Sequence, residues 1–133
     1  MITGLNVNIR TTRAGPVIEL KGRLDHDTAP DVLTLLPGLA LRPGQQLVVD
    51  LAQLTFCDSR GISVLVAARN RALAADVIFV LTAVPERVDR IFRITGLEQV
   101  FFTCTSAQEA DRAWIPPARQ PVGPSCNGDE GVT

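Results

Sequence analysis

Residues 47–81 read LVVDLAQLTFCDSRGISVLVAARNRALAADVIFVL, a stretch whose hydrophobic pattern changes twice. Its two ends, 47–51 and 77–81, are apolar runs typical of strands that are buried on both faces. Between them apolar residues recur at helical spacing, and 64–75 is rich in Ala, Leu and Arg, which are good helix formers. Strand, helix and strand over about thirty residues predict a βαβ unit with two parallel strands. Residues 52–58 are expected to form the loop between the first strand and the helix.

The residues before this unit predict a hairpin and a short helix. Apolar and polar residues alternate over 7–11, and a second apolar segment covers 17–22, which is the pattern of half-buried strands. Gly15 lies between them and can adopt the positive φ of a tight turn, so we expect the two strands to pair in antiparallel fashion. A helix should follow, with Thr28 as its N-cap and the Pro-Gly pair at 37–38 as its end.

The residues after the unit predict a helix, a strand and a second helix. The first helix should begin at Pro85, which suits a first turn, and end at Gly96. A short strand is expected over 100–102, and Ser106 with Glu109 three residues later is a capping-box pattern for the last helix. Together these elements predict the α/β class, with a mixed central sheet of about five strands and about four helices.

Composition favours one globular domain followed by a tail. The chain has 133 residues, of which 46% are hydrophobic and 20% charged, a balance typical of a folded single-domain protein. From Pro116 onward Pro and Gly are frequent and apolar residues are few. We therefore expect a domain over 1–115 and a disordered Pro/Gly-rich tail over 116–133.

Charge, hydropathy and residue counts argue against several classes of function. The net charge of −1 provides no basic field for nucleic acid. No apolar run approaches the about twenty residues of a membrane span, and no signal peptide is visible, so we expect a cytoplasmic protein. His26 is the only histidine, and the three cysteines lack the CxxC spacing of zinc ligands, so we expect no metal site and no other cofactor.

The segment 56–62, FCDSRGI, carries the most specific chemical signal, because it joins a buried strand to an amphipathic helix. Asp58 or Ser59 can cap the helix, a role that contributes about 1 kcal/mol. A serine at this position is also exposed in the partial positive field of the helix N-terminus, where a phosphate is well tolerated. Gly61 has no side chain, which suggests that a partner can approach the backbone closely.

Three segments follow a known pattern in the same order. In 48–72 an apolar strand is followed by Phe56 and then by Asp-Ser-Arg-Gly-Ile. The segment 22–30, GRLDHDTAP, has the form G-x-L-D-x-x-T-A, and 91–101 contains the ending TGL…F. This combination resembles the STAS-domain anti-sigma factor antagonists of bacteria. The resemblance covers residues 5–114 and implies the STAS fold.

The resemblance implies a partner-switching function without enzymatic activity of the chain itself. In this family an anti-sigma factor that is also a serine kinase phosphorylates the serine after the aspartate, which is Ser59 here. The unphosphorylated form binds that anti-sigma factor, which then releases its sigma factor, and a serine phosphatase resets the cycle. The implied partner-binding residues are Asp25, His26, Asp27, Thr28, Asp58, Ser59, Arg60, Gly61 and Ile62.

Other interpretations of the motif differ in what Ser59 and Asp58 do. A non-switching STAS interaction module, in a lipid-transport or signalling-scaffold complex, has the same fold without a phosphorylation cycle, and the intact Asp-Ser pair favours the switching type. Arg60 stands where many members of the family have a small residue, so partner choice is open. A receiver domain phosphorylated on Asp58 is disfavoured, because no acidic pair follows the first strand and the only lysine is Lys21.

Overall fold

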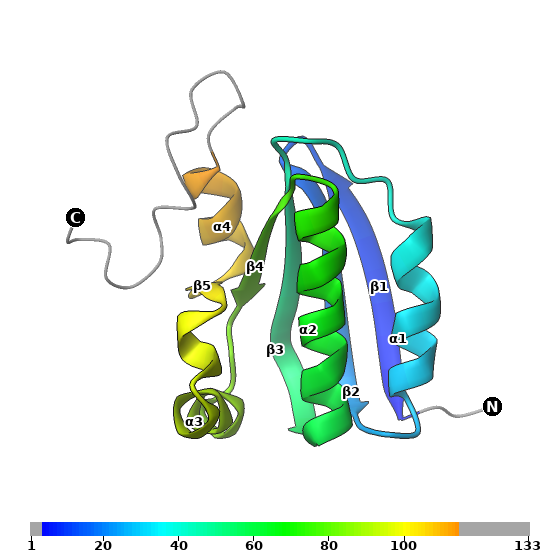
Figure 1. Cartoon of the computed structure of the whole chain (residues 1–133), viewed down its shortest axis with the longest axis vertical. Helices are drawn as coiled ribbons and strands as arrows, with labels where there is room; N and C mark the ends of the chain where they lie inside the picture. Colours follow the sequence, from blue (N-terminus) through cyan, green and yellow to red (C-terminus); the bar gives the residue numbers. More distant parts are fainter. Residues whose placement is uncertain (1–3, 115–133) are drawn as a thin grey trace.

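A five-stranded mixed sheet is the frame of the molecule, seen in a computed structural model that describes residues 4–114 (Figure 1). Its strands are β1 (Leu5–Thr12), β2 (Gly15–Leu24), β3 (Gln46–Cys57), β4 (Ile78–Thr82) and β5 (Phe102–Cys104). They lie in the sheet in chain order, with β1 antiparallel to β2 and the remaining neighbours parallel. The predicted hairpin and the predicted βαβ unit are both confirmed.

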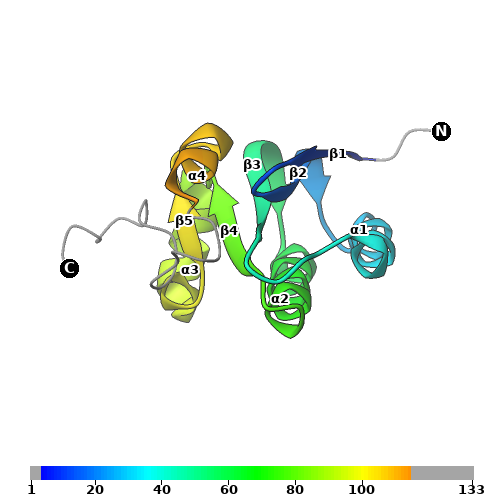
Figure 2. The same cartoon turned by 90° about the horizontal axis from the view of Figure 1, so that it is seen from above.

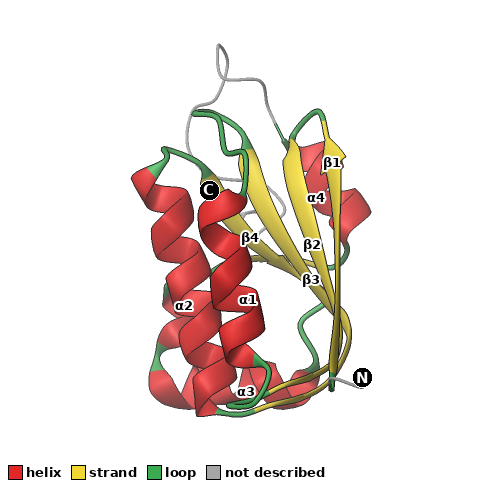
Figure 3. Cartoon of the chain, turned by 90° about the vertical axis from the view of Figure 1, so that its right-hand side faces the viewer, coloured by secondary structure: helices red, strands yellow, loops and turns green. Residues whose placement is uncertain are grey.

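Helices cover the two faces of the sheet unequally. Within residues 4–114 they are α1 (Ala29–Leu35), α2 (Ser59–Ala74), α3 (Glu86–Thr95) and α4 (Ala107–Ala113), with 3-10 turns at Leu36–Gly38 and Leu97–Gln99. Seen from above, α1, α2 and α3 lie on one face, and α4 lies on the other face (Figure 2). Figure 3 shows the same division from the side. The fold is α/β, as the sequence predicts.

Each face of the sheet has a hydrophobic core of its own. The larger core lies under α1, α2 and α3, and its fully buried members include Leu47, Leu51, Leu65, Leu81 and Phe92. The smaller core lies under α4 and consists of Val17, Val48, Val80, Cys104, Ala107 and Ala110. Successive residues of β3 and β4 point to opposite cores, which explains why both strands begin as unbroken apolar runs.

Strand β3 is longer than expected, and the prediction of a loop over 52–58 is wrong. The strand continues to Cys57, which pairs with Leu24 at the end of β2. The apolar run is interrupted because the second half of β3 is covered on one side only. Gln53 is exposed, whereas Leu54 lies in the larger core. A half-buried strand has polar residues on its exposed side and therefore lacks the continuous apolar run of a strand that is buried on both faces.

The last strand is also displaced, from the expected 100–102 to β5. A 3-10 turn precedes it, and Phe101 fills the larger core instead of continuing a strand. The ring centroid of Phe101 is 5.8 Å from that of Phe79 and 5.1 Å from that of Phe92. Aromatic pairs at such separations add about 0.5–1.5 kcal/mol each beyond their burial. This packing fixes the 3-10 turn at Leu97–Gln99, so that β5 begins only at Phe102.

Helix ends follow the predicted chemistry with one exception. The N–H of Glu109 donates to the Ser106 hydroxyl at 3.0 Å, and Gly96 ends α3 in the left-handed conformation with a φ of 83°. Thr28 occupies the N-cap position of α1, but its side chain makes no capping hydrogen bond. Its hydroxyl donates instead to the carbonyl of Arg23 at 2.8 Å. The expected side-chain cap at Thr28 is therefore wrong.

Thr82 in β4 provides a test of the core. Its side chain is fully buried, and within residues 4–114 its hydroxyl is the one buried side-chain polar atom without a hydrogen-bond partner. An unsatisfied buried group of this kind costs about 1–3 kcal/mol. We expect Thr82→Val, which keeps the shape and removes the hydroxyl, to raise the free energy of unfolding in urea by about 1 kcal/mol. Thr82→Ser is the control and should destabilise; a destabilised Thr82→Val would contradict this account.

Two sequence predictions concern the limits of the domain and the membrane. None of the helices in residues 4–114 combines the length and apolarity needed to cross a bilayer. The structure describes the predicted domain from residue 4 to residue 114. The predicted boundary after residue 115 and the predicted tail over 116–133 lie outside the described residues.

Candidate functional site

Two loops singled out in the sequence lie side by side at one end of the sheet. Strands β2 and β3 run parallel, and Leu24 and Cys57 at their ends are paired. The N–H of Asp58 donates to the carbonyl of Leu24 at 3.3 Å, which joins the roots of the two loops. The loops over 25–28 and 58–61 therefore lie beside one another at one surface, although they are distant in the sequence.

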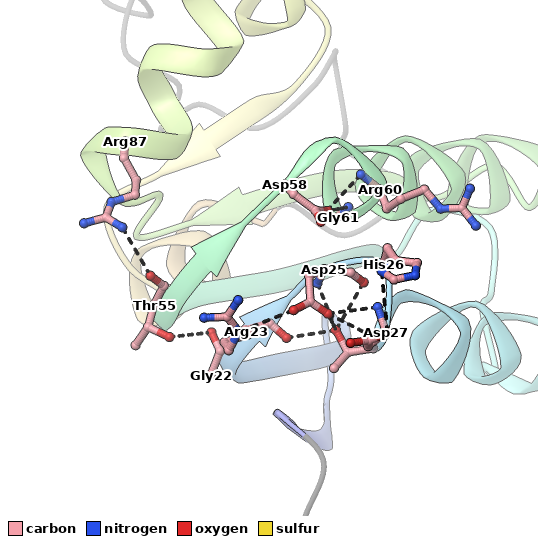
Figure 4. A network of polar contacts seen from close by, with 11 residues as sticks. Gly22, Arg23, Asp25, His26, Asp27, Thr55, Asp58, Arg60, Gly61 and Arg87 are labelled. Carbon is pink, nitrogen blue, oxygen red and sulfur yellow. Dashed lines mark hydrogen bonds and ion pairs between the residues drawn. The ribbon is translucent and has the colours of Figure 1, made fainter.

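The first loop is held in shape by its own side chains (Figure 4). The carboxylate of Asp25 accepts hydrogen bonds from the N–H of Asp27 at 3.0 Å and of Thr28 at 3.2 Å. The Thr28 hydroxyl in turn accepts from the N–H of Asp25 at 3.0 Å. These bonds preorganise the turn, and the side chains of His26 and Asp27 at its tip remain exposed.

Arg23 is the positively charged partner of Asp25 in this loop. Its Nε lies 3.3 Å from a carboxylate oxygen of Asp25, and its guanidinium lies over the ring of Phe56, 4.4 Å from the centroid. Desolvation by burial raises the pKa of Asp25, but the backbone N–H groups of the loop and the Arg23 side chain outweigh it and hold that pKa below its usual value. Asp25 is therefore ionised at neutral pH and shapes the loop.

Asp58 is the N-cap of α2. Its Oδ1 accepts from the N–H of Arg60 at 2.9 Å and from the N–H of Gly61 at 3.0 Å. Ser59 is the first residue of the helix and is exposed, and within residues 4–114 its hydroxyl has no hydrogen-bond partner. Of the two capping candidates, Asp58 takes the structural role, which leaves the Ser59 hydroxyl accessible.

Removal of this cap has a defined expected effect. Asp58→Ala deletes the acceptor of two backbone N–H groups and should lower the free energy of unfolding by about 1–2 kcal/mol. Asp58→Asn keeps an acceptor oxygen without the charge and should retain most of the stability. Both values can be measured by chemical denaturation. Equal losses in the two variants would show that charge, and not the capping bonds, stabilises α2.

Gly61 and Ile62 face inward, which changes how the motif is understood. A Cβ at Gly61 would lie 2.4 Å from the carbonyl oxygen of Leu24 and 2.7 Å from Sγ of Cys57. Ile62 is a member of the larger core. The interpretation that the missing side chain of Gly61 admits a partner is therefore wrong, because β2 and Cys57 already fill that space. The close contact fixes α2 and its first turn against the sheet.

The reactive group that this surface presents is the hydroxyl of Ser59. Burial, and secondly the neighbouring charge of Asp58, raises the pKa of the Cys57 thiol to about 12. A thiol in that state is protonated at neutral pH and is a poor nucleophile. Among residues 4–114, no three His, Cys, Asp or Glu side chains are grouped so that they could hold a metal ion.

Arg87 joins this surface from α3, a role that the sequence does not reveal. Its Nη1 donates to the carbonyl of Thr55 at 3.5 Å, and the Thr55 hydroxyl donates to the carbonyl of Gly22 at 3.0 Å (Figure 4). These contacts connect α3, β3 and β2 beside the two loops. The sequence does not indicate this contact, because Thr55 lies in the second half of β3, where the hydropathy pattern does not predict a strand.

Comparisons with known proteins agree on one family. A protein-family model described as "Mlab, STAS domain" matches residues 7–103. The chain is also similar to a curated anti-sigma-B factor antagonist of Staphylococcus aureus (strain NCTC 8325), with 29% identity over 98 residues. That alignment covers 72% of this chain and 91% of the relative.

Solved structures show the same fold. An anti-sigma factor antagonist from Mycobacterium paratuberculosis aligns with a TM-score of 0.68 and 22% identity, over 83% of this chain and 93% of that chain. The Bacillus cell fate determinant SpoIIAA in its phosphorylated form aligns with a TM-score of 0.58 and 21% identity, over 80% of this chain and 98% of that chain. At these identities the likeness concerns the fold, and it confirms the predicted arrangement of strands and helices.

Proposed function

The chain belongs to the STAS domain family, and on that premise we propose that it is an anti-sigma factor antagonist. Its unphosphorylated form binds an anti-sigma factor, which then releases a sigma factor. The anti-sigma factor, acting as a serine kinase, phosphorylates Ser59 and thereby ends the binding, and a serine phosphatase restores it. The name of the Staphylococcus aureus relative supports the antagonist role.

The observation that carries this proposal is the exposed hydroxyl of Ser59 on the first turn of α2. Asp58 caps the helix, so modification of Ser59 removes no structural hydrogen bond. The helix dipole favours a negative group at this end by about 0.3–1 kcal/mol. A phosphate on Ser59 therefore changes the surface and leaves the fold intact.

In this proposal the chain is the substrate of phosphoryl transfer and has no catalytic role. The kinase provides the nucleotide, the metal ion and the base. The Ser59 oxygen attacks the γ-phosphorus of ATP, the bond to the ADP oxygen breaks, and the serine proton passes to the base of the kinase. The accessible position of Ser59 is all that this reaction requires of the chain.

The proposed partner-binding surface consists of the two adjacent loops. The side chains offered to a partner are the exposed ones, namely His26, Asp27, Ser59 and Arg60. Asp25, Thr28 and Asp58 hold the loops in shape through the hydrogen bonds described above. Gly61 and Ile62 support the surface from beneath and do not line it.

Phosphorylation with the cognate kinase tests the proposal. After incubation with ATP and the anti-sigma factor of the same cell, intact-mass analysis should show one added phosphate on the parent chain. Ser59→Ala should gain none. Ser63→Ala, one turn further along α2 at another exposed serine, should still gain one. A parent chain that binds the anti-sigma factor but is never phosphorylated would contradict the switching mechanism.

A second candidate is a STAS interaction module that works without phosphorylation, in a lipid-transport or signalling-scaffold complex. The matching family model is described by the STAS domain, which this candidate and the antagonist function share. The second candidate predicts a stable complex in which Ser59→Asp binds its partner as well as the parent does. The antagonist function predicts a large loss of binding for the same variant.

A further inference from the structure

We propose that the outer edge of β1 is a self-association surface, through which two copies of this chain join their sheets. Within residues 4–114, strand β1 pairs with β2 alone and forms one border of the sheet, as Figures 1 and 2 show. The occupant of this edge is a second copy of β1 itself. The proposal does not depend on the antagonist function, because it uses a different part of the molecule.

The backbone of β1 offers hydrogen-bonding groups on its outer side. The N–H of Arg23 donates to the carbonyl of Gly4, directly before the strand, so even-numbered residues of β1 bond to β2. In an antiparallel ladder the odd-numbered residues then point their N–H and carbonyl groups away from β2. Val7 and Ile9 are in this position, and in the described part of the chain they make no hydrogen bond beyond the sheet.

The strand has few of the features that normally block pairing at a sheet edge, and Arg10 is its one charged residue. Its eight residues contain no proline and no lysine, and its pairing with β2 has no bulge. Ile9 is 40% exposed, whereas Val7 on the same face packs against the larger core. The opposite border of the sheet is different, because β5 has only three residues. The apolar side chains of Val7 and Ile9, next to their outward backbone groups, indicate a pairing surface in the middle of β1.

The residue order of β1 is complementary to itself when two copies pair antiparallel around Asn8. In that register Val7 of each copy lies opposite Ile9 of the other, and each such pair exchanges two backbone hydrogen bonds. Arg10 lies opposite Asn6, so the two Arg10 side chains stay apart, and each is already paired with Glu19 at 3.2 Å. A register centred on Arg10 would instead oppose like charges, which is destabilising.

The resulting dimer keeps both proposed partner surfaces accessible. Ser59 lies at the carboxyl end of β3, and β2 and β3 run antiparallel to β1. Because the two β1 strands are themselves antiparallel, the Ser59 surfaces point toward opposite ends of one continuous sheet. Failure of dimerisation and failure of partner binding are therefore separate experimental results.

Sedimentation velocity on the full chain tests whether two copies associate through the outer edge of β1. The parent should show a concentration-dependent monomer–dimer equilibrium. Ile9→Pro removes one outward N–H and keeps the bonds to β2, and we expect it to raise the dimer dissociation constant by about tenfold or more. Ile9→Thr is the matched control, because it keeps the N–H and β-branching, and it should still dimerise. A parent that is monomeric at every concentration, or an Ile9→Pro variant that dimerises as well as the parent, overturns the proposal.

Cysteine cross-linking tests the register and does not rely on the proline variant. In the proposed register residue 8 lies opposite its own copy in a non-hydrogen-bonded pair, with Cα atoms about 4.5 Å apart, which a disulfide can bridge. Diamide oxidation of Asn8→Cys should give a covalent dimer well above the level of the parent. In Arg10→Cys the two new cysteines lie several positions apart in the proposed register, so the yield of covalent dimer should not exceed that of the parent. Equal cross-linking of both variants overturns the register.

Discussion

Gly61→Ala is expected to destabilise the fold by about 3 kcal/mol, in spite of the better helix propensity of alanine. The added Cβ would meet the carbonyl oxygen of Leu24 at 2.4 Å and Sγ of Cys57 at 2.7 Å. The nearest contact is a backbone atom at the end of β2, so relief requires α2 to move away from the sheet. For a domain of this size, a loss of 3 kcal/mol lowers the melting temperature by roughly 10 °C or more. Thermal unfolding measures this directly.

Gly38→Ala is the matched control for this prediction. A Cβ at Gly38 meets no atom within 4 Å, and no positive φ applies there. Alanine at such a site is neutral or stabilising by about 0.4–1 kcal/mol, because it restricts the unfolded chain. Similar melting temperatures for the two variants would show that α2 has room to adjust and that Gly61 is not a close contact.

Ser59→Asp is expected to weaken binding of the anti-sigma factor by at least about a hundredfold. Under the proposed function, the new charge lies next to Asp58 and faces a kinase whose site holds a nucleotide phosphate, and opposed like charges at an interface cost several kcal/mol. The melting temperature should stay close to that of the parent, because the helix N-terminus favours an acidic residue. Calorimetric titration with the purified anti-sigma factor measures the binding, and a melting curve measures the fold.

Two variants separate the effect of position from that of charge. Ser63→Asp adds the same charge at an exposed residue about 6 Å further along α2, and it should bind nearly as well as the parent. Ser59→Ala should bind but should not be released after incubation with ATP. If Ser59→Asp binds like the parent, or if its melting temperature falls by many degrees, local repulsion is not the mechanism.

Hydrophobic periodicity predicts those parts of the fold that depend on local pattern. The hairpin, the βαβ unit and the limits of α3 at Pro85 and Gly96 follow from residues close together in the sequence. The second half of β3 could not be predicted in this way, because its pairing partner, β2, is distant in the chain. The start of β5 depends on Phe101 packing against Phe79 and Phe92, which is also a long-range contact.

The candidate functional site also depends on long-range contacts that the local sequence pattern does not predict. Asp58 and Ser59 could be named from their place before a helix, but which of them caps it depends on backbone geometry at the end of β3. The role of Gly61 does not follow from the sequence pattern, because the atom that it approaches belongs to Leu24, on another strand. Arg87 gave no signal at all, since a charged residue on an amphipathic helix is usually solvated.

The division of roles between Asp58 and Ser59 has a consequence for the substitutions that this chain can tolerate. Because the neighbouring carboxylate holds the helix end, the side chain at position 59 carries no folding requirement of its own. A library of all amino acids at position 59 should therefore yield mostly folded proteins, whereas the same library at position 58 should be restricted to good capping residues. If position 59 controls partner binding as proposed, selection for that control can act independently of selection for stability.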